Sequence, residues 1–207
     1  MSTATTTRKK FFTAKNVAYL GVLLALVVAL QLWGSAIPMF GVTLNLSLIP
    51  IALGGIFFGA LGGGLMGFVS GLVTFITCAL MGQEPSTAYL FQHSPVILTI
   101  VCLGKTTAAG AVSGLLYSLI SKKNKPIASY VASLTVPVVN TALYVVGILL
   151  MKEQAAALMG IESSLTVVFV ALIGLIWLNF LLEIATTVLL SPAVHLIVRV
   201  AEKNFKK

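Results

Sequence analysis

The chain has 207 residues, of which 58% are hydrophobic and only 9% are charged, and its mean hydropathy is +1.07. A soluble globular domain carries about 25% charged residues, so this composition excludes a soluble fold and indicates an integral membrane protein. The formal net charge of +8 does not indicate a nucleic-acid partner, because most of the basic residues gather in three short clusters, within residues 8–15, 122–125 and 199–207.

Six apolar runs in chain order are predicted to be transmembrane helices, at roughly 20 apolar residues for each bilayer crossing. They cover residues 17–33, 44–58, 61–81, 96–120, 127–151 and 165–190. The expected fold is therefore all-α, with a basic cytoplasmic N-terminal segment at residues 1–16, a six-helix membrane domain at 17–198 and a basic cytoplasmic tail at 199–207.

The three basic clusters predict the orientation, because Lys and Arg are enriched in cytoplasmic loops. With a cytoplasmic N-terminus, six spans place the loop after the fourth span and the C-terminus on the cytoplasmic side, where the second and third clusters fall. The three outer loops then contain Lys152 as their only Lys or Arg, and Glu84, Glu153 and Glu162 as acids. The positions of the basic residues therefore agree with a count of six spans.

The segment between the second and third spans is rich in glycine, with eight glycines between residues 54 and 71. Glycine permits a close approach of helices, a tight turn, or non-helical backbone that is buried in protein.

The sequence argues against catalysis. It contains no Asp, which excludes aspartate-rich metal motifs, and its two histidines, His93 and His195, fall near opposite membrane faces. Residues 104–106 read Gly-Lys-Thr, but Thr99 occupies the place of the first glycine of a phosphate-binding loop. We therefore expect no catalytic residues, no metal, no cofactor and no ATPase site in this chain.

Polar side chains within the last three spans are the remaining candidates for function, because such groups are costly in lipid. Two pairs are one helical turn apart, Asn140 with Tyr144 and Asn179 with Glu183. An alternative is that Lys105 and Glu183 neutralise each other and that the asparagines hydrogen-bond between helices for packing. The sequence predicts a pocket lined by Lys105, Asn140, Tyr144, Trp177, Asn179 and Glu183.

The second outer loop, which reads GQEPSTAYLFQHSP over residues 82–95, is long enough to fold over a pocket mouth. The first outer loop and its flanks, around Trp33, Phe40 and Asn45, form the other side of that mouth in this interpretation, with Asn45 among the substrate-binding residues. The lid candidates are Trp33, Tyr89, Phe91, Gln92 and His93.

Two segments carry a family resemblance: LNLSLIPIALGGIFFGALGGGLMGFVSGL at residues 44–72 and NFLLEIATTVLLSP at residues 179–192. With six short spans and basic inner loops, the chain resembles the substrate-binding S components of energy-coupling factor (ECF) vitamin transporters. The resemblance implies a bacterial plasma membrane protein that binds a vitamin from outside. It implies as partners a transmembrane T component and two ATP-binding-cassette ATPases.

In this family the S component docks on the T component through small residues spaced four apart on the first helix, and Gly21, Ala25 and Ala29 have that spacing. A single intramembrane Lys suits a carboxylate ligand, so pantothenate is the first candidate, followed by riboflavin or another vitamin. The alternative function is a stand-alone facilitator of small solutes or a non-transporting membrane assembly protein.

Overall fold

The computed structural model describes residues 14–35, 38–39, 42–43 and 45–205. Most of the predicted N-terminal basic segment, together with Phe40, lies outside these described residues. The elements in chain order are α1 (Ala14–Ser35), β1 (Pro38–Met39), β2 (Val42–Thr43), α2 (Leu48–Thr74), the π-helix η1 (Phe75–Leu80), α3 (Pro85–His93), α4 (Pro95–Ile120), α5 (Lys125–Leu150), α6 (Lys152–Met159) and α7 (Leu165–Phe205). The strands β1 and β2 form a short antiparallel pair.

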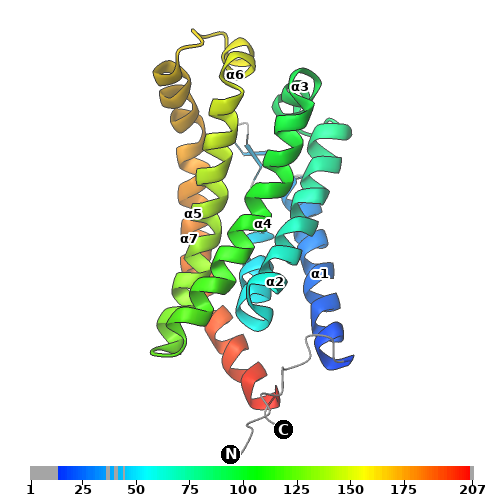
Figure 1. The fold of residues 1–207 in the computed structure, drawn as a ribbon, viewed down its shortest axis with the longest axis vertical. Coiled ribbons are helices and arrows are strands. Elements are labelled where there is room, and N and C mark those ends of the chain that lie inside the picture. Colours follow the sequence, from blue (N-terminus) through cyan, green and yellow to red (C-terminus); the bar gives the residue numbers. More distant parts are fainter. Residues whose placement is uncertain (1–13, 36–37, 40–41, 44, 206–207) are drawn as a thin grey trace, which may run out of the picture.

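The predicted all-α membrane fold is confirmed. Five helical stretches of the described chain are long and apolar enough to cross a bilayer, at residues 16–34, 48–80, 95–120, 125–150 and 165–197. The long helices run along one axis, and the short helices α3 and α6 lie together at one end (Figure 1). The prediction of six spans differs only at residues 48–80, where two predicted spans form one helical stretch.

This stretch folds back on itself at Gly59. Its backbone is non-helical there, with φ 69° and ψ −163°, a conformation that glycine adopts without steric cost. A Cβ atom placed on Gly63 would lie 2.9 Å from the Cα of Gly55, whereas eight residues of straight helix separate two positions by about 12 Å. Residues 48–58 and 60–80 are therefore two antiparallel arms, as the glycine-rich sequence suggested.

Close packing of backbones joins α2 to α4. A Cβ atom on Gly67 would lie 2.0 Å from the carbonyl oxygen of Thr106, and one on Gly63 would lie 2.1 Å from that of Gly110. These distances leave no room for a Cβ atom. Only glycine, which has a hydrogen atom in place of a side chain, permits this contact. We call this contact the glycine ladder, formed by Gly55, Gly59, Gly63, Gly67 and Gly71 against Gly110, Gly114 and the α4 backbone between Cys102 and Thr106.

The helix ends follow local sequence signals. Pro85 and Pro95 stand at the first positions of α3 and α4, where the missing N–H needs no partner. The side chain of Asn124 caps α5 by accepting a hydrogen bond from the N–H of Ile127 at 3.1 Å. Gly160 ends α6 in the left-handed conformation, with φ 66° and ψ 34°.

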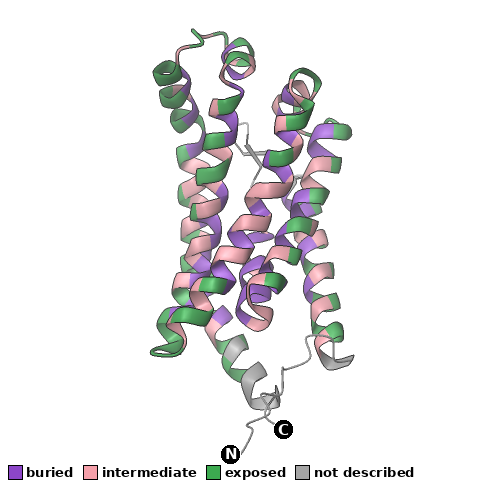
Figure 2. Ribbon diagram, viewed as in Figure 1, coloured by how far each residue is buried: buried purple, intermediate pink, exposed green. Residues whose placement is uncertain are grey.

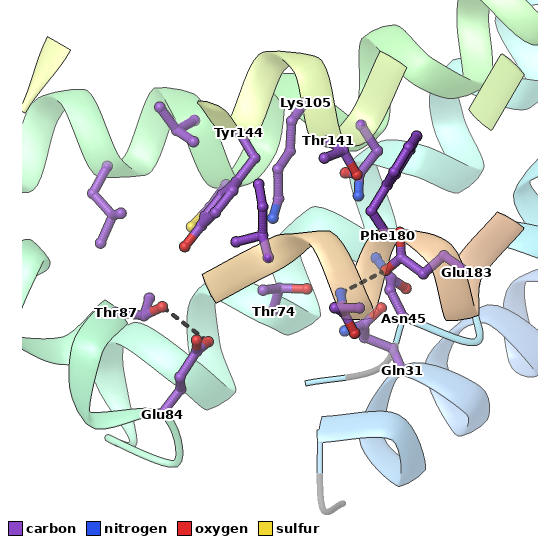
Figure 3. A pocket seen from close by; sticks show the side chains of 16 residues that line it. Gln31, Asn45, Thr74, Glu84, Thr87, Lys105, Thr141, Tyr144, Phe180 and Glu183 are labelled. Carbon is purple, nitrogen blue, oxygen red and sulfur yellow. Dashed lines mark hydrogen bonds between the residues drawn. The ribbon is translucent and has the colours of Figure 1, made fainter. Parts of the chain in front are cut away.

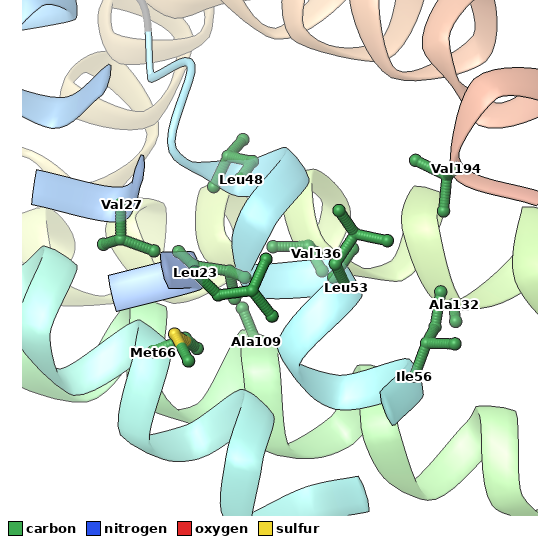
Figure 4. Packing of buried hydrophobic residues seen from close by; sticks show 12 residues of the cluster. Leu23, Val27, Leu48, Leu53, Ile56, Met66, Ala109, Ala132, Val136 and Val194 are labelled. Carbon is green, nitrogen blue, oxygen red and sulfur yellow. The ribbon is translucent and has the colours of Figure 1, made fainter. Parts of the chain in front are cut away.

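The apolar residues form two buried clusters. The first lies among α1, α2, α4, α5 and α7 and includes Leu23, Ile51, Met66, Val136 and Val194 (Figure 4). The second lies toward the end that carries α3 and α6. Exposed residues lie on the outer faces of the helices (Figure 2). Only 22% of the apolar window in α1 and 17% of that in α7 are buried. These two helices therefore offer the most apolar surface to lipid or to a partner.

Candidate functional site

A cavity of about 770 Å³, partly open to solvent, lies among α4, α5 and α7 and is completed by residues of α1, α2, α3 and the loops before α2 and α3 (Figure 3). Sixteen residues line it, and most of them are polar, in contrast to the apolar clusters above and below. The polar lining consists of Gln31, Asn45, Thr74, Glu84, Thr87, Lys105, Asn140, Thr141, Tyr144, Asn179 and Glu183.

Lys105 supplies the positive charge of this cavity from the middle of α4. Its Nζ lies 4.7 Å from the ring centroid of Tyr144 on α5, which is a cation–π distance. No carboxylate of the described residues lies within 4.0 Å of this Nζ, so Lys105 and Glu183 do not form an ion pair. Both residues nevertheless line the same cavity, so their charges still act on each other across it.

Asn179 and Glu183 share one face of α7, as their spacing predicted. The amide Nδ2 of Asn179 donates a hydrogen bond to Glu183 Oε1 at 3.3 Å (Figure 3). Asn179 Oδ1, Glu183 Oε2 and Asn140 Oδ1 are buried and accept no hydrogen bond from any described residue. Because buried polar atoms are normally paired, these three acceptors favour a bound group that donates to them.

The structure brings six of the seven predicted substrate-binding residues to this cavity: Asn45, Lys105, Asn140, Tyr144, Asn179 and Glu183. Trp177 is not among them. It is 52% exposed on the outer surface of α7, because two residues of helix turn the side chain by about 200° away from Asn179.

The structure does not place the predicted lid residues in the cavity wall. Trp33 is 62% exposed, and Gln92 and His93 are exposed on α3. Phe91 packs edge-on against Phe75 with ring centroids 5.3 Å apart, and Tyr89 contacts the ring of His93. The lid role of these five residues remains a prediction.

Residues near the start of the second outer loop, unlike the predicted lid residues, do line the cavity. Glu84 precedes α3, and its carboxylate accepts hydrogen bonds from Thr87 Oγ1 at 2.9 Å and from Ser86 Oγ at 3.3 Å. Glu84 and Thr87 both line the cavity (Figure 3). The sequence interpretation noted Glu84 only as a loop charge.

A buried polar cluster supports the side of the cavity formed by α1 and α2. Ser47 Oγ contacts Gln31 Oε1 at 2.8 Å, Asn45 Oδ1 at 2.7 Å and Ser70 Oγ at 2.7 Å. Ser47 and Ser70 are fully buried. Gln31 is not among the residues predicted from the sequence, although a single amide in an otherwise apolar first span is the kind of signal that marks a functional or packing site.

A second, mainly apolar cavity of about 550 Å³ lies beside the first, between α3, α5, α6 and α7. Glu84, Tyr144 and Ile176 line both cavities, so these three residues form the boundary between them. The polar cavity is therefore bordered by an apolar space on the side that carries α3 and α6.

The predicted docking residues Gly21, Ala25 and Ala29 are all exposed on α1. A Cβ atom on Gly21 would meet no other atom within 4 Å. This face of α1 is therefore free for contact with lipid or with another helix.

Comparison with known proteins identifies the family. The family model described as the substrate-specific component of ECF transporters matches residues 15–195. No curated protein and no solved structure matches the chain. Because the matched region contains the whole helical bundle around the polar cavity, the chain belongs to the substrate-specific components of ECF transporters and is a multi-pass membrane subunit of a transport system.

Proposed function

We propose that the polar cavity binds a small water-soluble vitamin or vitamin precursor that carries a carboxylate, with pantothenate as the first candidate. The observation that carries this proposal is the ammonium group of Lys105, which lies in the cavity without a carboxylate partner among the described residues. A cation in a cavity of a membrane protein that makes no direct ion pair favours an anionic ligand, because charge-assisted hydrogen bonds are strongest away from water.

The acceptors on the other helices narrow the ligand class further. Asn140 Oδ1, Asn179 Oδ1 and Glu183 Oε2 need hydrogen-bond donors. Pantothenate has one carboxylate, one amide N–H and two hydroxyl groups, which amounts to one anion and three donors. Its chemistry therefore complements one Lys and three acceptors.

Identification of the natural ligand tests this proposal directly. The protein is purified in detergent without added ligand, and any small molecule released on denaturation is identified by mass spectrometry. The empty protein is then titrated calorimetrically with pantothenate and with a panel of other vitamins. Tight binding of pantothenate or another carboxylate supports the proposal, whereas binding only of a ligand without a carboxylate, or of none, contradicts it.

Removal of one acceptor is expected to weaken the ligand complex. Asn140→Leu keeps the size of the side chain and loses the amide, so we expect an increase in Kd of about 3- to 10-fold, as for one neutral hydrogen bond. Thr135→Val is the matched control, because Thr135 lies on the same helix and bonds only to the carbonyl of Val131 at 2.7 Å. An unchanged Kd in Asn140→Leu would remove Asn140 from the ligand contacts.

The charge distribution supports a cytoplasmic position for the end at which α1 begins and α7 ends. Lys122 and Lys123 follow α4 at this end (Figure 1), and Arg199 lies in the last turns of α7. The ligand then enters from the opposite side, where the loop before α3 contributes Glu84 and Thr87. In the proposed cycle, the loaded subunit docks on the T component and tips in the membrane, and two partner ATPases reset it.

The exposed small residues of α1 provide the proposed docking surface for the T component. Ala25→Leu adds bulk where two helix backbones are expected to approach closely, so we expect about a tenfold loss of T component in copurification after coexpression. The Kd for the vitamin is expected to stay unchanged, because Ala25 is not in the cavity wall.

The matched control for this experiment is Gly174→Leu on α7. Gly174 is also exposed, and a Cβ atom there would meet nothing within 4 Å. If both variants lose the T component equally, added bulk at the lipid boundary is the cause and the docking assignment is wrong.

A further inference from the structure

In the part of the chain that the structure describes, the buried side-chain polar atoms without a hydrogen-bond partner are confined to two helices. Within the described part of the chain there are five such side-chain atoms, and all belong to α5 or α7: Ser133 Oγ, Asn140 Oδ1, Asn179 Oδ1, Glu183 Oε2 and His195 Nδ1. Buried hydroxyls on α2 and α4 have partners, as Ser70 does with Gln31 Oε1 and Ser113 does with the carbonyl of Ala132. Among the described residues, the buried hydroxyls on α2 and α4 therefore have hydrogen-bond partners, whereas several buried polar groups on α5 and α7 do not.

Two of the five atoms lie outside the polar cavity. Ser133 stands two helical turns before Asn140 on the same side of α5, because seven residues make nearly two full turns. His195 follows Glu183 by twelve residues, or about 18 Å of helix. The helix α5 begins and the helix α7 ends at the end of the molecule where α1 begins (Figure 1). Because Ser133 precedes Asn140 on α5 and His195 follows Glu183 on α7, both residues lie on the side of the cavity toward that end.

Further polar groups fill the interval between the cavity and His195. Thr187 is 5% exposed and Ser191 is 0% exposed. Their hydroxyls donate to carbonyls of their own helix, Glu183 and Thr187, at 2.7 Å each. Buried hydroxyls that bond only to their own helix leave oxygen lone pairs available to another donor.

The backbone adds two acceptors to the same region. Pro137 lies inside α5 and Pro192 inside α7. Proline has no N–H, so the carbonyl groups four residues earlier, on Ser133 and Val188, lose their usual helical partners. At Ser133, both the carbonyl and the hydroxyl therefore lack the hydrogen bonds that a regular buried helix position would give them.

We propose that the part of α5 and α7 between the polar cavity and the basic end of the molecule binds water, and that it forms a hydrated extension of the cavity. We call it the α5–α7 seam and define it by Ser133, Pro137, Thr187, Ser191 and His195. Buried water typically satisfies about three polar groups that have no protein partner, and this seam supplies such groups on both helices. This proposal does not depend on which substrate the polar cavity binds.

Cysteine labelling tests the seam. Ser133→Cys and Ser191→Cys are compared with Ser113→Cys, in which a fully buried serine of α4 is replaced. Each purified variant is treated with 2-aminoethyl methanethiosulfonate, and peptide mapping separates the new site from the native Cys78 and Cys102. Because thiols shielded from water are inert, we expect labelling at residues 133 and 191 to be about tenfold faster than at residue 113. Equally slow labelling at all three sites would overturn the proposal.

Hydrogen–deuterium exchange of the unmodified protein provides a test that needs no variant to fold. The amides of residues 184–191 and 193–195 on α7 are compared with those of residues 103–114 on α4; Pro192 has no amide N–H. Faster exchange on α7 is expected if water reaches the seam, and equal protection of the two segments would contradict a hydrated interface.

Discussion

Replacement of Lys105 by methionine is expected to raise the Kd for a carboxylate vitamin about 30- to 150-fold, which corresponds to the loss of one charged hydrogen bond of about 2–3 kcal/mol. Methionine keeps the length and apolar stem of the side chain, so the cavity retains its shape. Isothermal titration calorimetry of the purified protein with pantothenate measures the effect.

A ligand without the carboxylate separates the charge effect from a general loss of structure. The alcohol analogue of pantothenate is expected to bind Lys105→Met and the parent protein with similar Kd values, because neither complex then contains the ion pair. Lys122→Met, which removes an exposed Lys after α4, is expected to change neither Kd. Equal Kd values for pantothenate in Lys105→Met and the parent protein would refute the carboxylate site.

Gly67→Ala is expected to destabilise the protein by about 3 kcal/mol or more, because overpacking of this severity forces whole helices apart. The new Cβ atom would lie 2.0 Å from the carbonyl oxygen of Thr106, and backbone cannot rotate away as a side chain can. Thermal unfolding in detergent, followed by circular dichroism, is expected to show a markedly lower Tm than that of the parent protein. Gly63→Ala is expected to behave in the same way.

Gly64→Ala is the control for this effect, since Gly64 adjoins Gly63 on the same helix. A Cβ atom at this position would lie 3.7 Å from the nearest atom, Ala111 Cβ, which is an ordinary contact. We expect its stability to stay within about 0.5 kcal/mol of the parent protein. A loss similar to that of Gly67→Ala would contradict this explanation, because an added methyl group would then destabilise the helix without a backbone contact and against the higher helix propensity of alanine.

The sequence predicted most of the transmembrane fold because hydropathy alone specifies which segments enter lipid. The predicted run at residues 96–120 differs from α4 by one residue, and the break between residues 58 and 61 falls on the observed turn at Gly59. The prediction placed a full second span at residues 44–58, however, where the helical arm begins only at Leu48. Hydropathy does not distinguish a complete crossing from a short apolar arm buried by its neighbours.

The cavity residues on α4, α5 and α7 were predictable because polar groups in apolar helices stand out against their surroundings. Lys105, Asn140, Asn179 and Glu183 are such groups, and all four line the cavity. Trp177 was predicted from its residue type, although its position relative to Asn179 points it to the opposite side of the helix. The 3.6-residue periodicity of the helix therefore separates Trp177 from the cavity face that Asn179 and Glu183 share.

Other wall residues were not predictable from one sequence. Thr74 and Thr141 are residues of a type that is common on helix surfaces. Whether they line the cavity depends on how α2 and α5 are rotated about their axes. Glu84 and Thr87 reach the cavity only because the loop before α3 places them there. Helix rotation and loop path are set by tertiary packing, which leaves no local signature in the sequence.

The turn at Gly59 has a consequence for the biosynthesis of the protein. The first arm, residues 48–58, is only about 16 Å long, roughly half the thickness of the hydrocarbon core of a bilayer. We therefore expect that a ribosome-bound nascent chain does not integrate this arm as an independent transmembrane segment. The expected insertion step is that of one helical hairpin, in which both arms enter the bilayer together after the residues up to 80 have emerged.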